Sequence, residues 1–171
     1  LFFIHVLRDP VEAALSQRNR AFDDPLFYEV GRELEEGAAL WLSLTAQALE
    51  QSLHCNNFYV SYPAILSEPA ITLEKMADFI GLQPDARRVQ AFCADFVTPE
   101  LHRSVANEKL NTALQERFPQ APAFYSKLKP LFSRGEVTLE ELQPLLDQYH
   151  APDTGLAIAR VMAPALSRLS E

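Results

Sequence analysis

Residues 3–20 have the sequence FIHVLRDPVEAALSQRNR, and this stretch predicts the fold more strongly than any other part of the chain. A nearly continuous apolar run is typical of a strand buried on both faces of a parallel sheet, and we expect that strand over residues 2–7. A helix should follow, because Asp9 can cap it and Pro10 suits its first position. Arg8 is then placed at the carboxyl end of a strand, where open α/β sheets bind their ligands.

Arg8 and Ser16 are the candidate anion-binding residues of this unit. A guanidinium presents a planar fork of donors that suits a phosphate, and Ser16 adds a hydroxyl eight residues further on. We also expect the positive end of the helix dipole to attract an anion in the same crevice. The residues alone leave another interpretation open, in which Arg8 pairs with Asp9 or Glu12 and the Ser16 hydroxyl bonds back to its own helix.

Two blocks of sequence resemble the sulfotransferases that use 3′-phosphoadenosine 5′-phosphosulfate as sulfuryl donor. The run VLRDP at 6–10, followed by Ser16, is similar to the 3′-phosphate-binding motif of that family. The second block is similar to the family's strand, tyrosine, short turn and helix. Its matching residues are FYVSY at 58–62, Leu66, Pro69, Leu73 and FIGL at 79–82. Trp41 and Leu49, in the helix expected before this block, also fit. The resemblance covers about residues 2–103.

The resemblance implies an α/β fold over residues 1–103, with a P-loop-like parallel sheet flanked by helices, of which this chain contributes a part. Residues 104–171 are expected to form a helical extension that packs on this domain or on a partner. In the family, an Arg and a Ser at the positions of Arg8 and Ser16 hold the 3′-phosphate of the donor. A tyrosine at the position of Tyr62 lies near the adenine.

Related bacterial sulfotransferases often carry a Pro-x-Leu-x-Arg-like stretch near the donor site, and TPELHR at 98–103 is similar to it. Arg103 is therefore a further candidate for phosphate contact, with His102 beside it. The alternative is that both are surface residues at the start of a helix. The implied reaction is transfer of a sulfuryl group from the nucleotide donor to a hydroxyl or amine of a small-molecule or glycan acceptor, without a metal.

Parts of the family pattern are missing from the chain. The family's loop around the 5′-phosphosulfate contains glycine, but the five glycines here, at 31, 37, 81, 135 and 155, are scattered. The Arg-Lys-Gly segment of cytosolic members is also not visible. We therefore interpret the chain as the C-terminal portion of a longer sulfotransferase-like protein. The catalytic base and the sulfate-contacting groups would come from the missing half, which either precedes this portion or is supplied by a partner chain or a second copy.

Composition limits the classes of partner. A net charge of −8 argues against a nucleic-acid surface, and no apolar run is long enough to span a membrane. With 171 residues, of which 48% are hydrophobic, the chain can bury one substantial core. Cys55 and Cys93 lack metal-ligand spacing and lie in or beside apolar segments, so we expect buried free thiols and a cytoplasmic location.

The remaining pattern is helical apart from a second buried strand at 58–62. Helices are expected at 37–53, 69–80 and 85–96. The buried side of the first should carry Leu40, Trp41, Leu44 and Ala48, and that of the third Val89, Phe92, Cys93 and Phe96. Gly81 should end the helix at 69–80. From about residue 107 the pattern predicts helices, and residues 138–141 form a capping box. Pro144 and Pro164 should kink or interrupt the helices that contain them.

For His5 and for the acidic segment 23–36 we favour a structural role over a catalytic or ligand-binding one. His5, inside an apolar strand, should be a packed and hydrogen-bonded residue rather than a catalyst. The segment 23–36 holds six acids against the single Arg32, and we interpret it as a solvated face, with a lid over an acceptor pocket as the alternative.

Two other functional classes stay open at this point. A P-loop nucleoside or nucleotide kinase would share the fold and an Arg in a similar crevice. A non-catalytic helical interaction module would retain Arg8 and Ser16 only as architecture.

Overall fold

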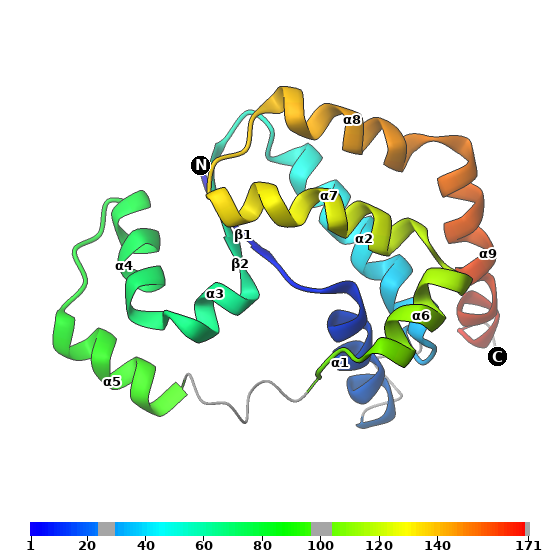
Figure 1. Ribbon diagram of the computed structural model, residues 1–171, viewed down its shortest axis with the longest axis horizontal. Helices are drawn as coiled ribbons and strands as arrows, with labels where there is room; N and C mark the ends of the chain where they lie inside the picture. Colours follow the sequence, from blue (N-terminus) through cyan, green and yellow to red (C-terminus); the bar gives the residue numbers. More distant parts are fainter. Residues whose placement is uncertain (24–29, 97–103, 170–171) are drawn as a thin grey trace.

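The computed structural model describes residues 1–23, 30–96 and 104–169, and these form an α/β protein in which helices predominate (Figure 1). Its elements in chain order are β1 (Phe2–Leu7), α1 (Pro10–Asp23), α2 (Leu34–Gln51), β2 (Asn56–Ser61), α3 (Tyr62–Ser67), α4 (Pro69–Phe79), α5 (Ala86–Phe96), α6 (Glu108–Arg117), α7 (Gln120–Arg134), α8 (Leu139–His150) and α9 (Pro152–Arg168).

The two strands pair in parallel, in a register that runs from Phe2 opposite Asn56 to Leu7 opposite Ser61. The first strand has the predicted bounds. The second was predicted at 58–62, but it ends one residue earlier, because Ser61 caps helix α3 by accepting a hydrogen bond from the Ala64 N–H at 3.3 Å. Tyr62 therefore begins α3 rather than ending the strand.

Strand β1 is only half buried, so the prediction of a strand buried on both faces is wrong. Leu7 is 2% exposed, whereas Phe2, Ile4 and Val6 are 52%, 41% and 47% exposed on the other face. Phe79 of α4 contacts the rings of both Phe2 and Phe58 on that face. Val60, on β2, is buried there. Helices α3 and α4 thus cover the β2 side of this face and leave most of the β1 side open.

Helix α2 buries a different side from the one predicted. Leu42, Ala46 and Leu49 are buried, while Leu44 is 57% exposed and Ala48, predicted on the buried side, is exposed as well. Trp41 is partly buried, with its ring edge-on to Phe124 and Tyr125 of α7. The helix is apolar around most of its circumference, so its periodicity does not identify which side meets the core.

Helices α1 and α2 pack very closely where Ala14 meets Gly37. A Cβ atom placed on Gly37 would lie 2.8 Å from the Ala14 Cα and 2.9 Å from its Cβ. Both Ala14 and the neighbouring Ala38 are fully buried. The absence of a side chain at Gly37 therefore sets the distance between the two helices.

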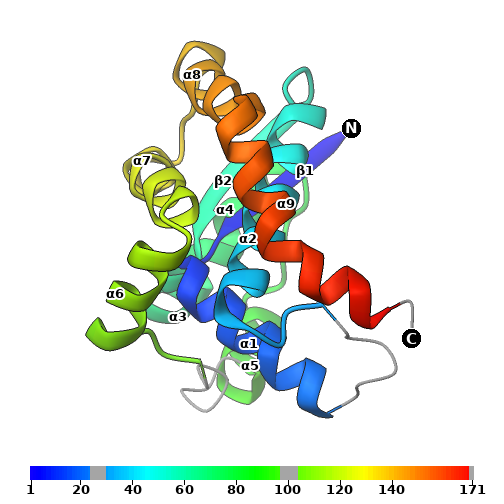
Figure 2. The same cartoon turned by 90° about the vertical axis from the view of Figure 1, so that its right-hand side faces the viewer.

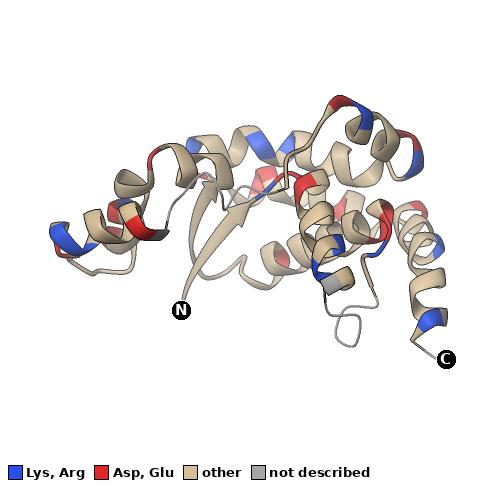
Figure 3. Cartoon of the chain, turned by 90° about the horizontal axis from the view of Figure 1, so that it is seen from below, with Lys and Arg blue, Asp and Glu red and all other residues tan. Residues whose placement is uncertain are grey.

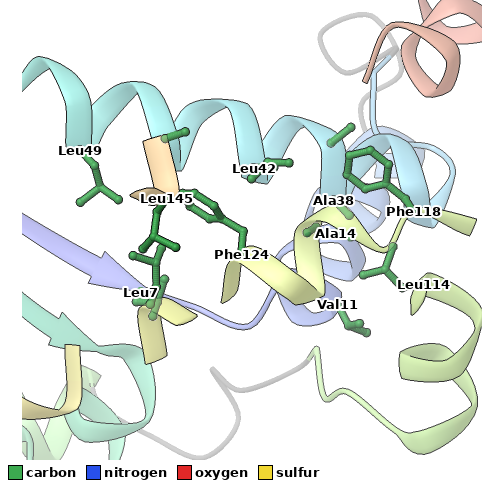
Figure 4. Close-up of a cluster of buried hydrophobic side chains, with 14 of the residues drawn as sticks. Leu7, Val11, Ala14, Ala38, Leu42, Leu49, Leu114, Phe118, Phe124 and Leu145 are labelled. Atoms are coloured by element: carbon green, nitrogen blue, oxygen red, sulfur yellow. The ribbon is translucent and has the colours of Figure 1, made fainter. Parts of the chain in front are cut away.

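The C-terminal helices share one hydrophobic core with β1, α1 and α2 (Figure 4). Leu114 precedes the turn into α7, and Phe124, Leu128 and Phe132 of α7 lie between α2 and the sheet side of the core. Helix α8 adds Leu142, Leu145 and Leu146, and α9 packs along α2 (Figure 2). The core thus joins residues near the start of the chain to residues beyond position 140.

Local helix signals in this region are partly confirmed. Thr138 and Glu141 form the predicted capping box of α8. The predicted interruptions are wrong, because α8 and α9 continue through Pro144 and Pro164, and α7 likewise contains Pro130. Loss of one backbone hydrogen bond at each proline is compatible with helices held by buried side chains on one face.

Helices α3, α4 and α5 form an arm that extends from the end of β2 (Figure 1). Helix α4 has nearly its predicted bounds, and Gly81 ends it with a left-handed φ of 75°. In α5 Val89 is buried as predicted, but Phe92 is 45% exposed. Within the described residues α5 packs mainly on α4, so it has one neighbouring element to cover its apolar face.

His5 confirms its predicted structural role. Its Nε2 atom lies 2.9 Å from Ser52 Oγ and 3.2 Å from Asn57 Oδ1, and its ring stacks on Tyr59. Burial lowers the pKa of this imidazole, and the hydrogen bond to Asn57 opposes that shift. Cys55 and Cys93 are free and half-buried.

Each helix in the described residues is too short or too polar to cross a membrane.

Substitution Gly37→Ala tests the close approach of α1 and α2. Alanine raises helix propensity by about 1 kcal/mol, but the new methyl group meets the backbone of α1, and overpacking costs about 1–3 kcal/mol. We expect a net loss in the free energy of unfolding, measured by urea denaturation. Gly155→Ala in α9 is the matched control, because a Cβ there meets nothing within 4 Å and the variant should be unchanged or more stable. Equal effects at both positions would contradict this packing.

The uncovered side of β1 leads to a prediction about self-association. Neither strand carries a charged residue (Figure 3), and edge strands without charge or proline tend to pair with other chains. We expect residues 1–171 to be oligomeric or poorly soluble at concentrations on the order of tens of micromolar. The substitution Ile4→Lys should shift the protein toward monomer, as measured by sedimentation velocity. Leu82→Lys is the control, since Leu82 is exposed in the turn that follows α4 and belongs to neither strand. A monomeric parent protein would refute the prediction.

Candidate functional site

Arg8 and Tyr62 meet at the carboxyl end of the sheet. Each follows directly on a strand, and the last residues of the two strands, Leu7 and Ser61, are paired. The Arg8 Cζ atom lies 4.7 Å from the centre of the Tyr62 ring, which is a cation–π contact. Both residues therefore lie, as predicted, at the carboxyl ends of the two strands, which we call the rim of the sheet. Their roles stay predictions.

The first turn of α1 is capped from within. Asp9 Oδ1 accepts hydrogen bonds from the N–H groups of Val11 at 2.8 Å and Glu12 at 3.3 Å. The Ala13 N–H donates to the Asp9 carbonyl at 2.9 Å, and Pro10 has no N–H. The N–H groups of Val11, Glu12 and Ala13 are thus all hydrogen-bonded within the turn, so side chains are the donors that this turn can offer to a ligand. Attraction of an anion by the helix dipole stays a prediction.

Arg8, two residues before α1, is followed at intervals of four residues by Glu12 and Ser16 within the helix. Residues spaced in this way on a helix are neighbours, with Cβ atoms about 5–6 Å apart. Arg8 Nε lies 3.5 Å from Glu12 Oε2, and the two side chains are 23% and 13% exposed. Ser16 is half-buried. The pairing of Arg8 with Glu12 is one of the alternatives that the sequence left open.

Helix α7 brings two further polar residues to this region, Tyr125 and Lys129. Burial raises the pKa of the Tyr125 phenol, and the negative charges of Asp9 and Glu12 raise it further. The Lys129 Nζ atom lies 6.0 Å from the centre of the Tyr125 ring. Sequence reasoning missed both residues, because no local motif links them to a strand end more than one hundred positions earlier.

Asp9 has an unusual electrostatic environment for a helix cap. Burial raises the pKa of its carboxyl group, and the Glu12 charge adds to this, while the two N–H bonds and the charge of Lys129 oppose it. The rim therefore combines the cations Arg8 and Lys129 with the carboxylates Asp9 and Glu12. Formal charges of these four residues cancel.

Two predicted candidates, Arg103 and His102, lie outside the described residues. A glycine-containing phosphate loop is likewise not contributed by any described element at this rim. In the described part of the chain no group of His, Cys, Asp and Glu residues is placed to hold a metal ion. A hollow of about 320 Å³ beside Cys55, Asn57 and Gly135 lies at the opposite end of β2 and does not include Arg8 or Tyr62.

The acidic segment 23–36 is not simply a solvated face, because Glu36, in the first turn of α2, is 1% exposed. Its carboxylate accepts two 2.8 Å hydrogen bonds from Arg168 Nη2 at the end of α9. It also accepts from the backbone N–H groups of Gly31 and Glu33. Glu35 pairs with Arg117 at 3.6 Å. These acids hold C-terminal helices against α2, while residues 24–29, on which the lid alternative depends, lie outside the described residues.

The fold is that of an α/β protein in which an arginine and a tyrosine meet at the carboxyl end of a parallel strand pair, among charges that balance. Comparisons with known proteins add no family to this description: no protein-family model, no curated protein and no solved structure matches the chain.

The raised pKa of Asp9 gives a prediction with a defined sign. The folded protein holds this proton more tightly than the unfolded chain, in which the carboxyl titrates near 3.8. Relative to Asp9→Asn, which keeps a capping side chain but cannot titrate, the parent protein should therefore gain unfolding free energy as pH falls from neutral toward 3.8. Urea denaturation of both proteins over this range measures the difference.

The cap itself is tested by Asp9→Ala, which should lose about 1 kcal/mol at neutral pH. A difference between parent and Asp9→Asn that stays flat, or that reverses in sign, would show that burial does not dominate at Asp9.

Proposed function

We propose that the rim at Arg8, Ser16 and Tyr62 binds the nucleotide of 3′-phosphoadenosine 5′-phosphosulfate, as part of a sulfotransferase. The observation that carries the proposal is the stacking of Arg8 on Tyr62 at the ends of two adjacent parallel strands, at 4.7 Å. A cation and an aromatic face side by side suit a ligand that joins a phosphate to a purine ring.

In this proposal each residue has a separate task. Arg8 contributes a fork of donors to the 3′-phosphate, and the Ser16 hydroxyl adds a hydrogen bond from the same side of α1. The Tyr62 ring supports the adenine from the start of α3. Lys129, on α7, adds a second positive charge at the edge of the site. Arg103 is retained as a further candidate on the grounds of the sequence alone.

The way in which the two strands are connected also supports the proposal. Strand β1, helices α1 and α2, and strand β2 form a crossover between parallel strands, which is the unit from which P-loop-like sheets are built. A sheet of that class has more strands than the two described here. We propose that a further segment, from a longer parent or from another chain, completes it and supplies the loop around the 5′-phosphosulfate.

The chemistry asked of these residues is positioning rather than bond making. The acceptor oxygen or nitrogen attacks the sulfur and gives up its proton to a base in the completing segment, the bond from sulfur to the bridging phosphate oxygen breaks, and adenosine 3′,5′-bisphosphate leaves with that electron pair. Holding the nucleotide at its 3′-phosphate and adenine aligns the breaking bond with the acceptor, and such alignment is a large part of catalysis in group transfer. The acceptor is a small molecule or a glycan in this proposal.

One observation favours a second class, a non-catalytic interaction module. Phe2, Ile4, Val6 and Leu44 are exposed around the open side of β1, and exposed apolar surface of this kind often marks a protein contact. In that case Arg8 would be satisfied by Glu12 and Tyr62 alone, and no nucleotide would bind.

Calorimetric titration with adenosine 3′,5′-bisphosphate tests the proposed site. Arg8→Ala should weaken binding by about 1.5–3 kcal/mol, and Ser16→Ala by about 0.5–1.5 kcal/mol, the ranges for a charged and an uncharged hydrogen bond. Arg87→Ala is the control, because Arg87 is exposed on α5 and carries the same charge. The parent should prefer the bisphosphate over adenosine 5′-phosphate, and Arg8→Ala should remove most of that preference.

Three outcomes would count against the proposal. Equal affinity for the monophosphate and the bisphosphate would exclude recognition of the 3′-phosphate. Binding of a nucleoside triphosphate that requires Mg²⁺ would favour the kinase. No nucleotide binding by a folded parent would favour the interaction module.

A further inference from the structure

We propose that Glu12 is a resident counter-anion of the Arg8 site, whose carboxylate must give way when a phosphate binds. The inference rests on the proposed function, since it concerns the same 3′-phosphate position. It assigns to Glu12 a role that neither the resemblance nor the cap of α1 provides, namely control of how tightly the site holds its anion.

The geometry of α1 places Glu12 between the two proposed phosphate ligands. Glu12 contacts Arg8, which precedes the helix, at 3.5 Å, and Ser16 follows Glu12 by one turn of α1, so Glu12 neighbours Arg8 on one side and Ser16 on the other. A phosphate that contacts both the Arg8 guanidinium and the Ser16 hydroxyl therefore lies over the Glu12 side chain. The ligand and the carboxylate compete for the same space.

Burial makes this competition matter energetically. The side chains of Arg8 and Glu12 are 23% and 13% exposed, so their interaction is less screened by water than that of an ordinary surface pair. A second anion placed beside Glu12 would meet repulsion under the same weak screening. Glu12 therefore lowers the affinity of the site for every phosphate, most of all for a dianion.

The contact between Arg8 and Glu12 is nevertheless of a kind that can be exchanged. The two atoms are 3.5 Å apart, and Arg8 Nε makes no hydrogen bond in the described residues. A phosphate can offer the guanidinium shorter, charge-assisted hydrogen bonds than this carboxylate does. The stacking of Arg8 on Tyr62 keeps the guanidinium in place during the exchange.

Other groups at the rim do not take over this role. Asp9 is engaged by the Val11 and Glu12 N–H groups, so its carboxylate is committed to the cap. Lys129 lies on a different helix, above Tyr125. Glu12 is thus the carboxylate whose removal should change anion affinity without removing the cap of α1.

The test is a double-mutant cycle on the full chain with Glu12→Gln, Arg8→Ala and the combined variant. The probes are inorganic phosphate, adenosine 5′-phosphate and adenosine 3′,5′-bisphosphate, titrated by calorimetry. We expect Glu12→Gln to tighten binding of the bisphosphate and of inorganic phosphate by about three- to tenfold, the effect of removing one partly screened charge. In the Arg8→Ala background the gain should disappear, because the ligand no longer occupies the position beside Glu12.

The matched control is Glu74→Gln, which removes the same charge from an exposed position on α4. It should leave all three affinities unchanged. Thermal unfolding of each variant shows whether it is folded, and Glu12→Asp provides a second variant that keeps the charge while shortening the side chain. Glu12→Asp should bind phosphate with an affinity between those of the parent and Glu12→Gln.

The outcomes separate this inference from the proposed function. Binding of the bisphosphate that depends on Arg8 but is unchanged or weakened by Glu12→Gln would overturn the inference and leave the function standing. Tighter binding of inorganic phosphate by Glu12→Gln, without any preference for the 3′-phosphate, would support the counter-anion and reject the sulfotransferase. Absence of phosphate binding in every folded variant would reject both.

Discussion

The close approach of α1 and α2 at Ala14 and Gly37 is the constraint on which the rest of the structure depends. Helix α1 follows directly on Arg8 and Asp9 and carries Glu12 and Ser16, and α2 makes most of the core contacts with the C-terminal helices. With no side chain at Gly37, the α1 backbone lies against α2, and Val11 and Ala14 are completely covered. This packing fixes the position of α1 and therefore of the residues at the end of β1, where the rim lies.

The side chains at the start of α1 that stabilise the helix are next to, or the same as, those proposed to bind a ligand. Asp9 uses the N–H groups of the first turn, and Glu12 balances the charge of Arg8. A helix that is stabilised in this way leaves little unsatisfied attraction for a ligand. Function at such a site requires exchange of existing contacts for new ones, and proteins commonly lose some stability where they keep groups available for binding.

The parts of the fold that the sequence predicts are those specified by neighbouring residues. The cap at Asp9, the left-handed stop at Gly81 and the capping box at Thr138 each depend on residues within one turn, and all three are present. Strand β1 is predicted from its apolar run, and the meeting of Arg8 with Tyr62 follows from parallel pairing of adjacent strand ends.

The features that sequence reasoning missed depend on residues far apart in the chain. Which side of α2 is buried depends on α7 and α8, because the helix is apolar on several sides. Exposure of Ile4 depends on how far α3 and α4 extend across the sheet. Tyr125 and Lys129 reach the rim only through packing of α7, so neither belongs to a motif with Arg8.

The ion pair between Glu36 and Arg168 ties the end of α9 to the beginning of α2 across 132 positions of sequence. Because Glu36 is buried, loss of its partner would leave a carboxylate without a counter-charge in the interior, at a cost of about 3–5 kcal/mol. The last helix and the helix beneath the rim should therefore open together in native-state hydrogen exchange, as one cooperative unit. The arm of α3, α4 and α5 lies outside this pair of helices and should exchange separately and sooner.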